Sequence, residues 1–350
     1  MGIAYDNNDL SYTTDNGSNL TRPHGFLGIF GRGAYKVFEQ NGNFIVPAGI
    51  SRLRVRVVGG GGGGSNGPNG GDAKVSGGPS GGGGGEFAIG VFNVAAAQSF
   101  AVTVGAGGMS NSNDGSAVGG AAISLAGGAS SFGALISAAG GQPGRCQNVG
   151  NATLNAGGLG GTGGTGGDFR ASGGQGGAGK ERYAGGGGGA GSQLGEGGSV
   201  SQLGTFNTGG AGVCNNVFAV TTVGGIANYG CGGASAFGSS RVAPGPNAYG
   251  QLAGEVAAVG YNLSQAVIRF PFDGFMGGGG SIGGGNGGSG GGGGGGAVGG
   301  FGGDGGGGGG GNVPTSVAVS LGGYGGGGGG FCRIGGPFNS GGPGLVIVEY

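Results

Sequence analysis

Runs of almost pure glycine limit what this chain can fold into more than any other feature. In residues 277–311, 27 of 35 positions are glycine. Five of the other residues recur in one phase of a three-residue repeat, and they are Asn286, Ser289, Val298, Phe301 and Asp304. Three residues per turn is the period of the extended polyproline II helix. An isolated glycine helix of this kind cannot offset the entropy of ordering its backbone, about 1–2 kcal/mol per residue. The stretch is therefore a flexible tether unless similar segments lie beside it.

Similar segments recur along the chain. Residues 157–168 form a GGX repeat in which Leu159, Thr162, Thr165 and Asp168 share one phase. Shorter runs lie at 59–64, 81–85, 173–179, 185–191, 322–330 and 335–344. In a bundle, such rods would pair their backbone N–H and C=O groups sideways, and each pair contributes about 0.5–1.5 kcal/mol. The repetition favours a bundle over a single linker, with 277–311 forming interior rods.

Composition excludes several classes of protein. One residue in three is glycine (115 of 350), as in collagen, but the chain has only 11 prolines. Charged residues make up 8% and the net charge is zero, so neither a basic nucleic-acid surface nor disorder driven by charge is expected. There is no apolar run of 18 residues and no recognisable signal peptide, so we expect no membrane insertion.

Alternating strand patterns stand at both ends of the glycine-rich part. In residues 52–57, Arg52, Arg54 and Arg56 alternate with apolar residues, and the arginines are expected to form a solvated strand face. A binding face for phosphate or acidic sugars stays an alternative. Segments 35–39 and 43–46 flank Asn41-Gly42, a hairpin signal. Further strands are expected within 86–104, where 86–94 should be buried on both faces, and at 345–350. The predicted fold is mainly β plus polyglycine II. It is an antiparallel β-sandwich (strands in 35–58, 86–104 and 345–350) with an inserted bundle of glycine-rich extended helices and almost no α-helix.

Residues 1–34 differ from the rest and are predicted to be an N-terminal arm or attachment segment, with 35–350 forming the sandwich and bundle. Loops within 168–276 carry aromatic and charged residues between the glycine runs, so they are the predicted exposed end. The four cysteines show no metal-binding spacing. They are expected to be buried or idle thiols, and a disulfide between Cys214 and Cys231 stays an alternative.

No catalytic, metal or cofactor site is predicted. The segment from Gly174 to Glu181 nearly matches a phosphate-binding loop, but Glu181 replaces the Ser or Thr that binds Mg²⁺. Such matches arise by chance in a chain so rich in glycine. With one histidine and scattered carboxylates, no general acid–base pair stands out.

Several short motifs, in their order, resemble the glycine-rich tail proteins of tailed bacteriophages. They are residues 44–50, 53–64, 81–86, 103–107, 130–133 and 342–348. The resemblance implies a non-enzymatic virion protein of the tail fibre or tail tip, made in the bacterial host cytoplasm. In the adhesins of T-even-like phages, layered polyglycine II rods present variable loops to the host surface. By this resemblance, the partners would be other tail proteins, bound through the N-terminal segment, and a host polysaccharide or outer-membrane protein. A homotrimer is expected.

The predicted receptor-binding residues are aromatic and basic side chains in the expected loops. They are Phe169, Arg170, Arg182, Tyr183, Phe206, Tyr229, Tyr249 and Tyr261. Two alternatives stay open. A polyglycine II antifreeze protein would need a regular Thr or Ala face, of which Thr162 and Thr165 give only a hint. A secreted glycine-rich structural protein would lack the alternating strands.

Overall fold

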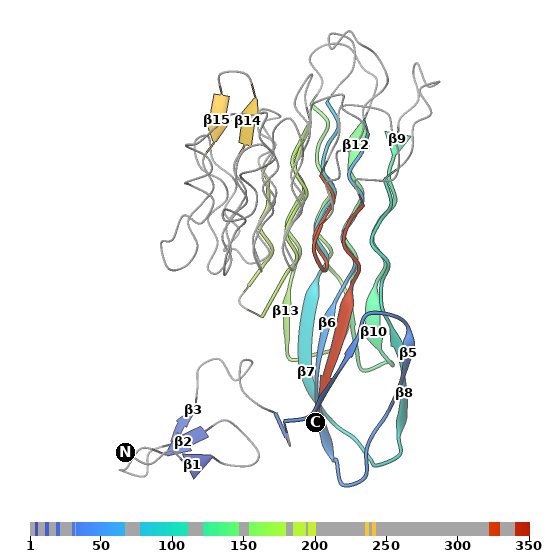
Figure 1. The fold of residues 1–350 in the computed structure, drawn as a ribbon, viewed down its shortest axis with the longest axis vertical. Coiled ribbons are helices and arrows are strands. Elements are labelled where there is room, and N and C mark those ends of the chain that lie inside the picture. Colours follow the sequence, from blue (N-terminus) through green and yellow to red (C-terminus); the bar gives the residue numbers. More distant parts are fainter. Residues whose placement is uncertain are drawn as a thin grey trace, which may run out of the picture.

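A computed structural model gives a β-sandwich at one end and a set of extended rods that run away from it (Figure 1). The structure describes residues 4–5, 11–13, 19–21, 30–31, 33–66, 78–110, 122–146, 154–179, 185–193, 195–200, 235–237, 240–242, 322–329 and 340–350. Within these ranges the chain is strand, turn and extended backbone, without helix. The mainly β prediction is therefore confirmed. The stretch 277–311 lies outside the described residues.

Two antiparallel sheets form the sandwich. The first has the order β13 (Phe169–Ala171), β7 (Phe87–Asn93), β6 (Arg52–Val58), β16 (Leu345–Glu349) and β4 (Tyr35–Phe38). The second has the order β11 (Ile136–Ala138), β10 (Ser130–Phe132), β8 (Ser99–Thr103) and β5 (Gly42–Ile45). Because β16 lies between β6 and β4, early and late strands of the chain close one sheet, as the alternating patterns predict.

Smaller sheets account for the remaining strands. One has the order β1 (Ala4–Tyr5), β2 (Ser11–Thr13) and β3 (Asn19–Thr21). Two further pairs join β9 (Ala122–Ile123) to β12 (Arg145–Cys146), and β14 (Ser235–Phe237) to β15 (Ser240–Val242).

The sandwich core follows from strand alternation. Leu53, Val55 and Val57 of β6 are fully buried, and they share one cluster with Phe100 and Phe132 of the opposite sheet. The two phenylalanine rings stack with centroids 4.7 Å apart. Side chains of the two inner faces thus fill the space between the sheets.

The predicted hairpin at Asn41-Gly42 is wrong. Strands β4 and β5 belong to different sheets, and the Asn41 side-chain oxygen accepts a hydrogen bond from the amide of Val104. Strands β7 and β8 are likewise separated, by a turn in which Ala97 has φ 63°. A turn signal reports a local reversal of the chain but not which sheet the next strand joins.

The predicted solvated arginine face of β6 is also wrong, apart from the exposed Arg52. Arg54 is 5% exposed and forms a two-bond ion pair with Glu349, its register partner on β16. Arg56 donates to the same carboxylate, and the guanidinium of Arg54 lies 5.2 Å from the centre of the Phe30 ring. On this face, Arg54 is therefore buried, while Arg56 and Glu349 are partly buried. On β7, the expected burial on both faces is confirmed over 87–90 but is wrong over 91–94, where the residues are partly or fully exposed.

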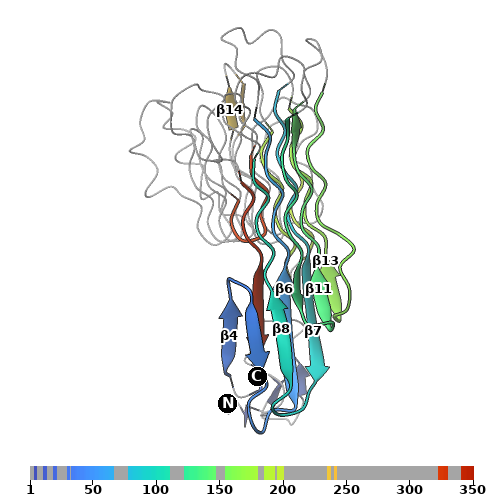
Figure 2. The same cartoon turned by 90° about the vertical axis from the view of Figure 1, so that its right-hand side faces the viewer.

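Strands of both sheets continue directly into glycine-rich rods (Figure 2). Strand β6 continues into 59–64, β8 into 104–109 and β11 into 139–144, while β7, β10 and β16 are entered from 81–86, 124–129 and 340–344. At about 3.1 Å per residue, six residues extend about 19 Å from the sandwich. The sandwich thus fixes where each rod starts.

Hydrogen bonds of the rod 81–86 change partner with a period of three. Its amides donate in turn to three neighbouring rods. Gly81 donates to Gly177 and Gly84 to Gly174 on the first rod, and Gly82 donates to Gly328 and Gly85 to Gly325 on the second. Gly83 donates to Gln142 and Glu86 to Ala139 on the third. Its carbonyls accept hydrogen bonds from three further rods. Gly81 accepts from Gly158 and Gly84 from Gly161, and Gly82 accepts from Gly188 and Gly85 from Gly191. Gly83 accepts from Gly62 and Glu86 from Gly59. This three-residue period is that of polyglycine II.

The neighbours of this rod also bond to one another and close a ring around it. The ring consists of 59–64, 139–144, 157–161, 173–177, 185–191 and 325–328. A second ring surrounds the rod 59–64, formed by 81–86, 139–144, 125–128, 105–109, 341–344 and 325–328. The described rods therefore pack as a hexagonal lattice, and for these rods the bundle that the repeated glycine runs predict is confirmed.

The two sheets of the sandwich come into direct backbone contact in the bundle. In the sandwich, β6 is separated from β10 and β11 by the side-chain core. Beyond Val58, the amide of Gly60 donates to the carbonyl of Gly128, and the carbonyl of Gly60 accepts from Gly141. Facing sheets normally lie about 10 Å apart because side chains separate them. Where glycine replaces those side chains, the gap closes to hydrogen-bonding distance.

Glycine is required in the inner rods because no space remains for a side chain. A Cβ added at Gly83 would lie 2.0 Å from the carbonyl oxygen of Leu159, and one at Gly84 would lie 1.9 Å from that of Gly189. These neighbours are backbone atoms that are held by their own hydrogen bonds. They cannot move aside without breaking the lattice.

The GGX repeat at 157–168 is only partly a rod. Leu159 is 61% exposed, and Thr162 and Thr165 are exposed in the same phase, so the third position of each triplet faces solvent. From residue 163 the chain turns: Gly163, Gly166 and Gly167 have φ of 90°, 70° and 84°. Glycine also permits this left-handed backbone. The same GGX pattern therefore occurs both in a rod and in a turn. Sequence periodicity alone does not distinguish these two structures.

We expect Gly83→Ala to lower the free energy of unfolding by about 1–3 kcal/mol or more, the usual cost of overpacking. Leu159→Ala is the control, since it leaves an alanine methyl group on the adjacent rod, where this group faces solvent. It should stay within about 0.5 kcal/mol of the parent. Denaturant unfolding of both variants measures the difference, and equal stabilities would contradict the close packing described above.

Candidate functional site at the junction of sandwich and bundle

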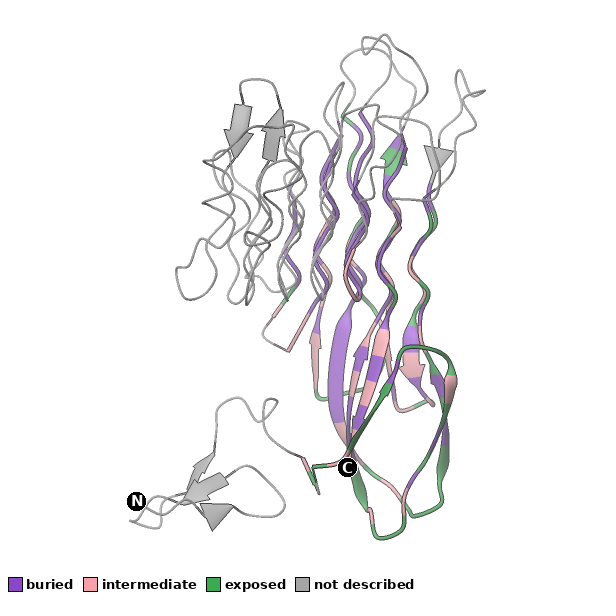
Figure 3. Cartoon of the chain, viewed as in Figure 1, coloured by how far each residue is buried: buried purple, intermediate pink, exposed green. Residues whose placement is uncertain are grey.

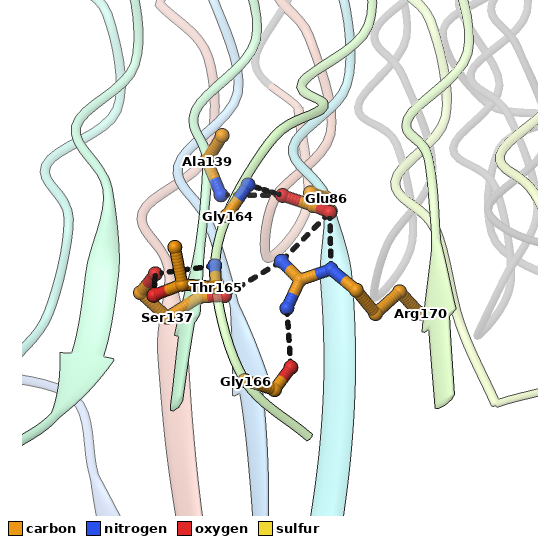
Figure 4. Close-up of polar contacts among 7 residues, drawn as sticks. All are labelled: Glu86, Ser137, Ala139, Gly164, Thr165, Gly166 and Arg170. Atoms are coloured by element: carbon orange, nitrogen blue, oxygen red, sulfur yellow. Dashed lines mark hydrogen bonds and ion pairs between the residues drawn. The ribbon is translucent and has the colours of Figure 1, made fainter. Parts of the chain in front are cut away.

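The main polar cluster lies where β7 begins and the rod 81–86 ends (Figure 4). Glu86 is 4% exposed, and its carboxylate is fully engaged. Oε2 accepts hydrogen bonds from the amides of Ala139 (2.9 Å) and Gly164 (2.8 Å). Oε1 accepts from Nε (2.9 Å) and Nη2 (2.8 Å) of Arg170. One buried carboxylate thus ties together three segments that are far apart in sequence.

Arg170 extends the cluster to two backbone carbonyls. Its Nη2 donates to the carbonyl of Ser137 (2.8 Å), and its Nη1 donates to that of Gly166 (2.6 Å). Burying an ion pair is favourable only when its remaining hydrogen-bonding capacity is met, as it is at this carboxylate and guanidinium. The guanidinium therefore fixes the turn after residue 162 against β11.

Short polar side chains complete the attachment of this turn. The Ser137 hydroxyl accepts from the amide of Thr165 (2.9 Å) and lies 3.1 Å from the Thr165 hydroxyl. Asp168 accepts from the amide of Val91 (2.8 Å) on β7. The turn is thereby bonded to both sheets of the sandwich.

The chemistry of this cluster is that of a structural clamp. Its carboxylate and guanidinium neutralise each other, and their atoms are occupied by partners from the protein itself. Across the described ranges, no group of three or more His, Cys, Asp or Glu side chains could hold a metal ion. The same ranges contain no helix long and apolar enough to cross a membrane.

The structure places two of the predicted receptor-binding residues at this junction. Phe169 and Arg170 belong to β13, so 169–171 form a strand rather than the expected loop. The Phe169 ring is partly buried and lies 6.5 Å from the ring of Phe87, while Arg170 bonds to Glu86. Six predicted residues lie outside the described ones: Arg182, Tyr183, Phe206, Tyr229, Tyr249 and Tyr261. Their role stays a prediction.

Sequence reasoning missed Glu86 and Glu349. Each is an isolated acidic residue in a chain with only 8% charged residues, at a boundary between glycine and strand or at the end of a strand. The strand patterns predict sheets, but they do not say which arginine lies opposite which carboxylate. Register supplies that information, as with Arg54 and Glu349.

Cys146 is a buried thiol on β12, at the end of the bundle away from the sandwich. Burial raises its pKa to about 11. The thiol is therefore protonated and unreactive near neutral pH, because the thiolate is the nucleophile. This agrees with the expectation of a buried, idle thiol, while Cys214, Cys231 and Cys332 lie outside the described residues.

Comparison with known proteins adds a family. A family model described as a glycine-rich domain matches residues 38–262, which is more than half of the chain. The chain belongs to this family. No curated protein matches the chain. In this glycine-rich domain, the matched region begins within β4 and includes both central rods and the Glu86–Arg170 clamp.

Removing one partner of the clamp should destabilise the glycine-rich domain strongly. Breaking a buried ion pair costs about 3–5 kcal/mol, and we expect Arg170→Met to fall near the lower end because its side chain is 26% exposed. Arg52→Met, on the exposed start of β6, is the matched control and should cost less than about 0.5 kcal/mol. In a double-mutant cycle with Glu86→Gln, additive losses of stability would contradict the pairing.

The raised pKa of Cys146 predicts a dependence of stability on pH. The unfolded-state thiol ionises near pH 9.0 and the folded-state thiol near pH 11. Its contribution to stability is therefore present below pH 9 and is lost as the pH rises to 11, by about 2–3 kcal/mol in total. The difference in unfolding free energy between the parent and Cys146→Ala measures this loss. A difference that does not change with pH would show that the thiol is not held in an apolar site.

Proposed function

We propose that this glycine-rich protein is a non-enzymatic structural component of a bacteriophage virion, in the tail fibre or tail tip, that takes part in binding the host receptor. One observation supports the proposal most. The sandwich strands continue into a hydrogen-bonded bundle, so that a stiff shaft separates the sandwich from the far end of the bundle (Figure 1).

Several connecting segments begin and end at the far end of this shaft. Ser65 bonds to Ser80, whose hydroxyl donates to the carbonyl of Arg145. Ser124 donates to Gly64, and Cys146 pairs with Ala122. The described residues that flank 67–77, 111–121 and 147–153 therefore lie at the same end of the bundle. A scaffold that carries several connecting segments at one end suits recognition of a cell surface, because binding residues often lie on loops held by a rigid scaffold.

Segment 180–184 has its flanks at the same end. Asn155 and Gly179 bond to each other through their backbones, the Asn155 side chain donates to Gly78, and the amide of Gly185 donates to Pro79. Arg182 and Tyr183 belong to this segment. This supports their assignment as receptor contacts, in contrast to Phe169 and Arg170 near the sandwich.

The proposal keeps the partners that the sequence resemblance implies. The N-terminal segment would attach the protein to other tail proteins, and a host polysaccharide or outer-membrane protein would be bound, with three copies forming the fibre. The antifreeze alternative gains no support, because the exposed phase of one outer rod contains Ala156, Leu159 and Thr162 rather than a regular threonine face.

We expect Arg182→Ala combined with Tyr183→Ala to reduce attachment of virions to host cells at least about tenfold, the effect of losing about 1.4 kcal/mol of binding. Leu159→Ala, on the side of the shaft, is the control and should leave attachment unchanged. Electron microscopy with antibody labelling measures whether the variant protein is still incorporated at the tail. Full attachment by the double variant would remove these two residues from the site, and absence of the protein from virions would overturn the proposed function.

A further inference from the structure

The described lattice has an outer row of three rods. These rods, 125–128, 139–144 and 157–161, bond to one another through Gly127 with Gly141 and through Gln142 with Leu159. Each also bonds to an inner rod, 59–64 or 81–86. The inner rods are buried throughout, whereas the outer rods have an exposed side (Figure 3).

The two sides of the outer row differ in residue type. The side that faces the lattice consists of glycines. A Cβ added at Gly127 would lie 2.1 Å from the carbonyl oxygen of Gly60, and a Cβ added at Gly141 would lie 2.0 Å from the carbonyl oxygen of Gly83. Facing solvent are side chains from all three rods, among them Leu125 and Leu159, each 61% exposed, and Gln142.

The backbone of the outer row could otherwise bond to further rods. Gly141 and Gly144 donate to Gly60 and Gly63, but Gly140, in the next phase, donates to no group among the described residues. Pro143, in the same phase as Gly140, has no N–H to donate. An exposed row of unpaired backbone groups is the feature by which sheet edges recruit other chains. The outer row would present the same hazard if it were glycine throughout.

We propose that the outward side chains of Leu125, Ala126, Gln142, Pro143 and Leu159 end the polyglycine lattice and keep this face from bonding to the rods of a second copy of this chain. In the lattice, rods approach so closely that even one methyl group meets backbone at about 2 Å. A side chain on the outer face therefore holds a second rod beyond hydrogen-bonding distance. This inference concerns self-association through one face and does not depend on the proposed function.

The test replaces the five residues with glycine, and the matched control replaces the same five with serine. Serine also removes the apolar groups but retains Cβ. Sedimentation equilibrium at increasing protein concentration should give the glycine variant a mass that rises to twice that of the parent assembly. The serine variant should match the parent. Equal masses for all three proteins would overturn the proposal, and so would equal association of the serine variant, because association would then not depend on Cβ.

A measurement on the parent protein covers the case in which the glycine variant does not fold. In amide hydrogen exchange by NMR, Gly140 should exchange far faster than its neighbour Gly141, whose amide bonds to Gly60. Slow exchange at Gly140 would mean that this face is already paired in solution, which would contradict a lattice that ends at the outer row.

Discussion

The structure of this protein depends most on how closely neighbouring backbones approach one another. Carbonyl oxygens lie about 2 Å from where a Cβ would stand at Gly83 and Gly84, so only hydrogen fits there. This closeness lets successive amides of one rod bond to three different neighbours. Each bond adds about 0.5–1.5 kcal/mol, and the rods are ordered only because their bonds are satisfied together. A single glycine rod would lack this compensation.

The sandwich solves the problem of aligning such rods. Poly-glycine carries no side chains to specify which rod lies beside which, or in what register. The strands do carry side chains. Leu53, Val55 and Val57 fix β6 against the opposite sheet, and the ion pair between Arg54 of β6 and Glu349 of β16 fixes the register of these two strands. Beyond the last core residues the same segments close up and bond directly. The Glu86–Arg170 clamp stands at this change, where side-chain packing gives way to backbone packing.

Composition and periodicity predict the mainly β fold and the bundle of rods, because each depends on local pattern. They do not predict which sheet a strand joins after a turn, as at Asn41, or where a GGX run stops being a rod, as at Gly163. Burial of Arg54 and the roles of Glu86 and Arg170 depend on contacts across more than 80 residues. Resemblance led to exposed aromatic and basic residues, and it did not distinguish Phe169 and Arg170 at the junction from Arg182 and Tyr183 in segment 180–184.

Amide hydrogen exchange at residues 82–85 tests the central claim most directly. If the rod is enclosed by six hydrogen-bonded neighbours, these glycine amides exchange only through global unfolding, with an opening free energy close to that of Val55 in the sandwich core. If the glycine runs are tethers, the same amides exchange at the rate of an unstructured chain while Val55 stays protected. That result would contradict the bundle.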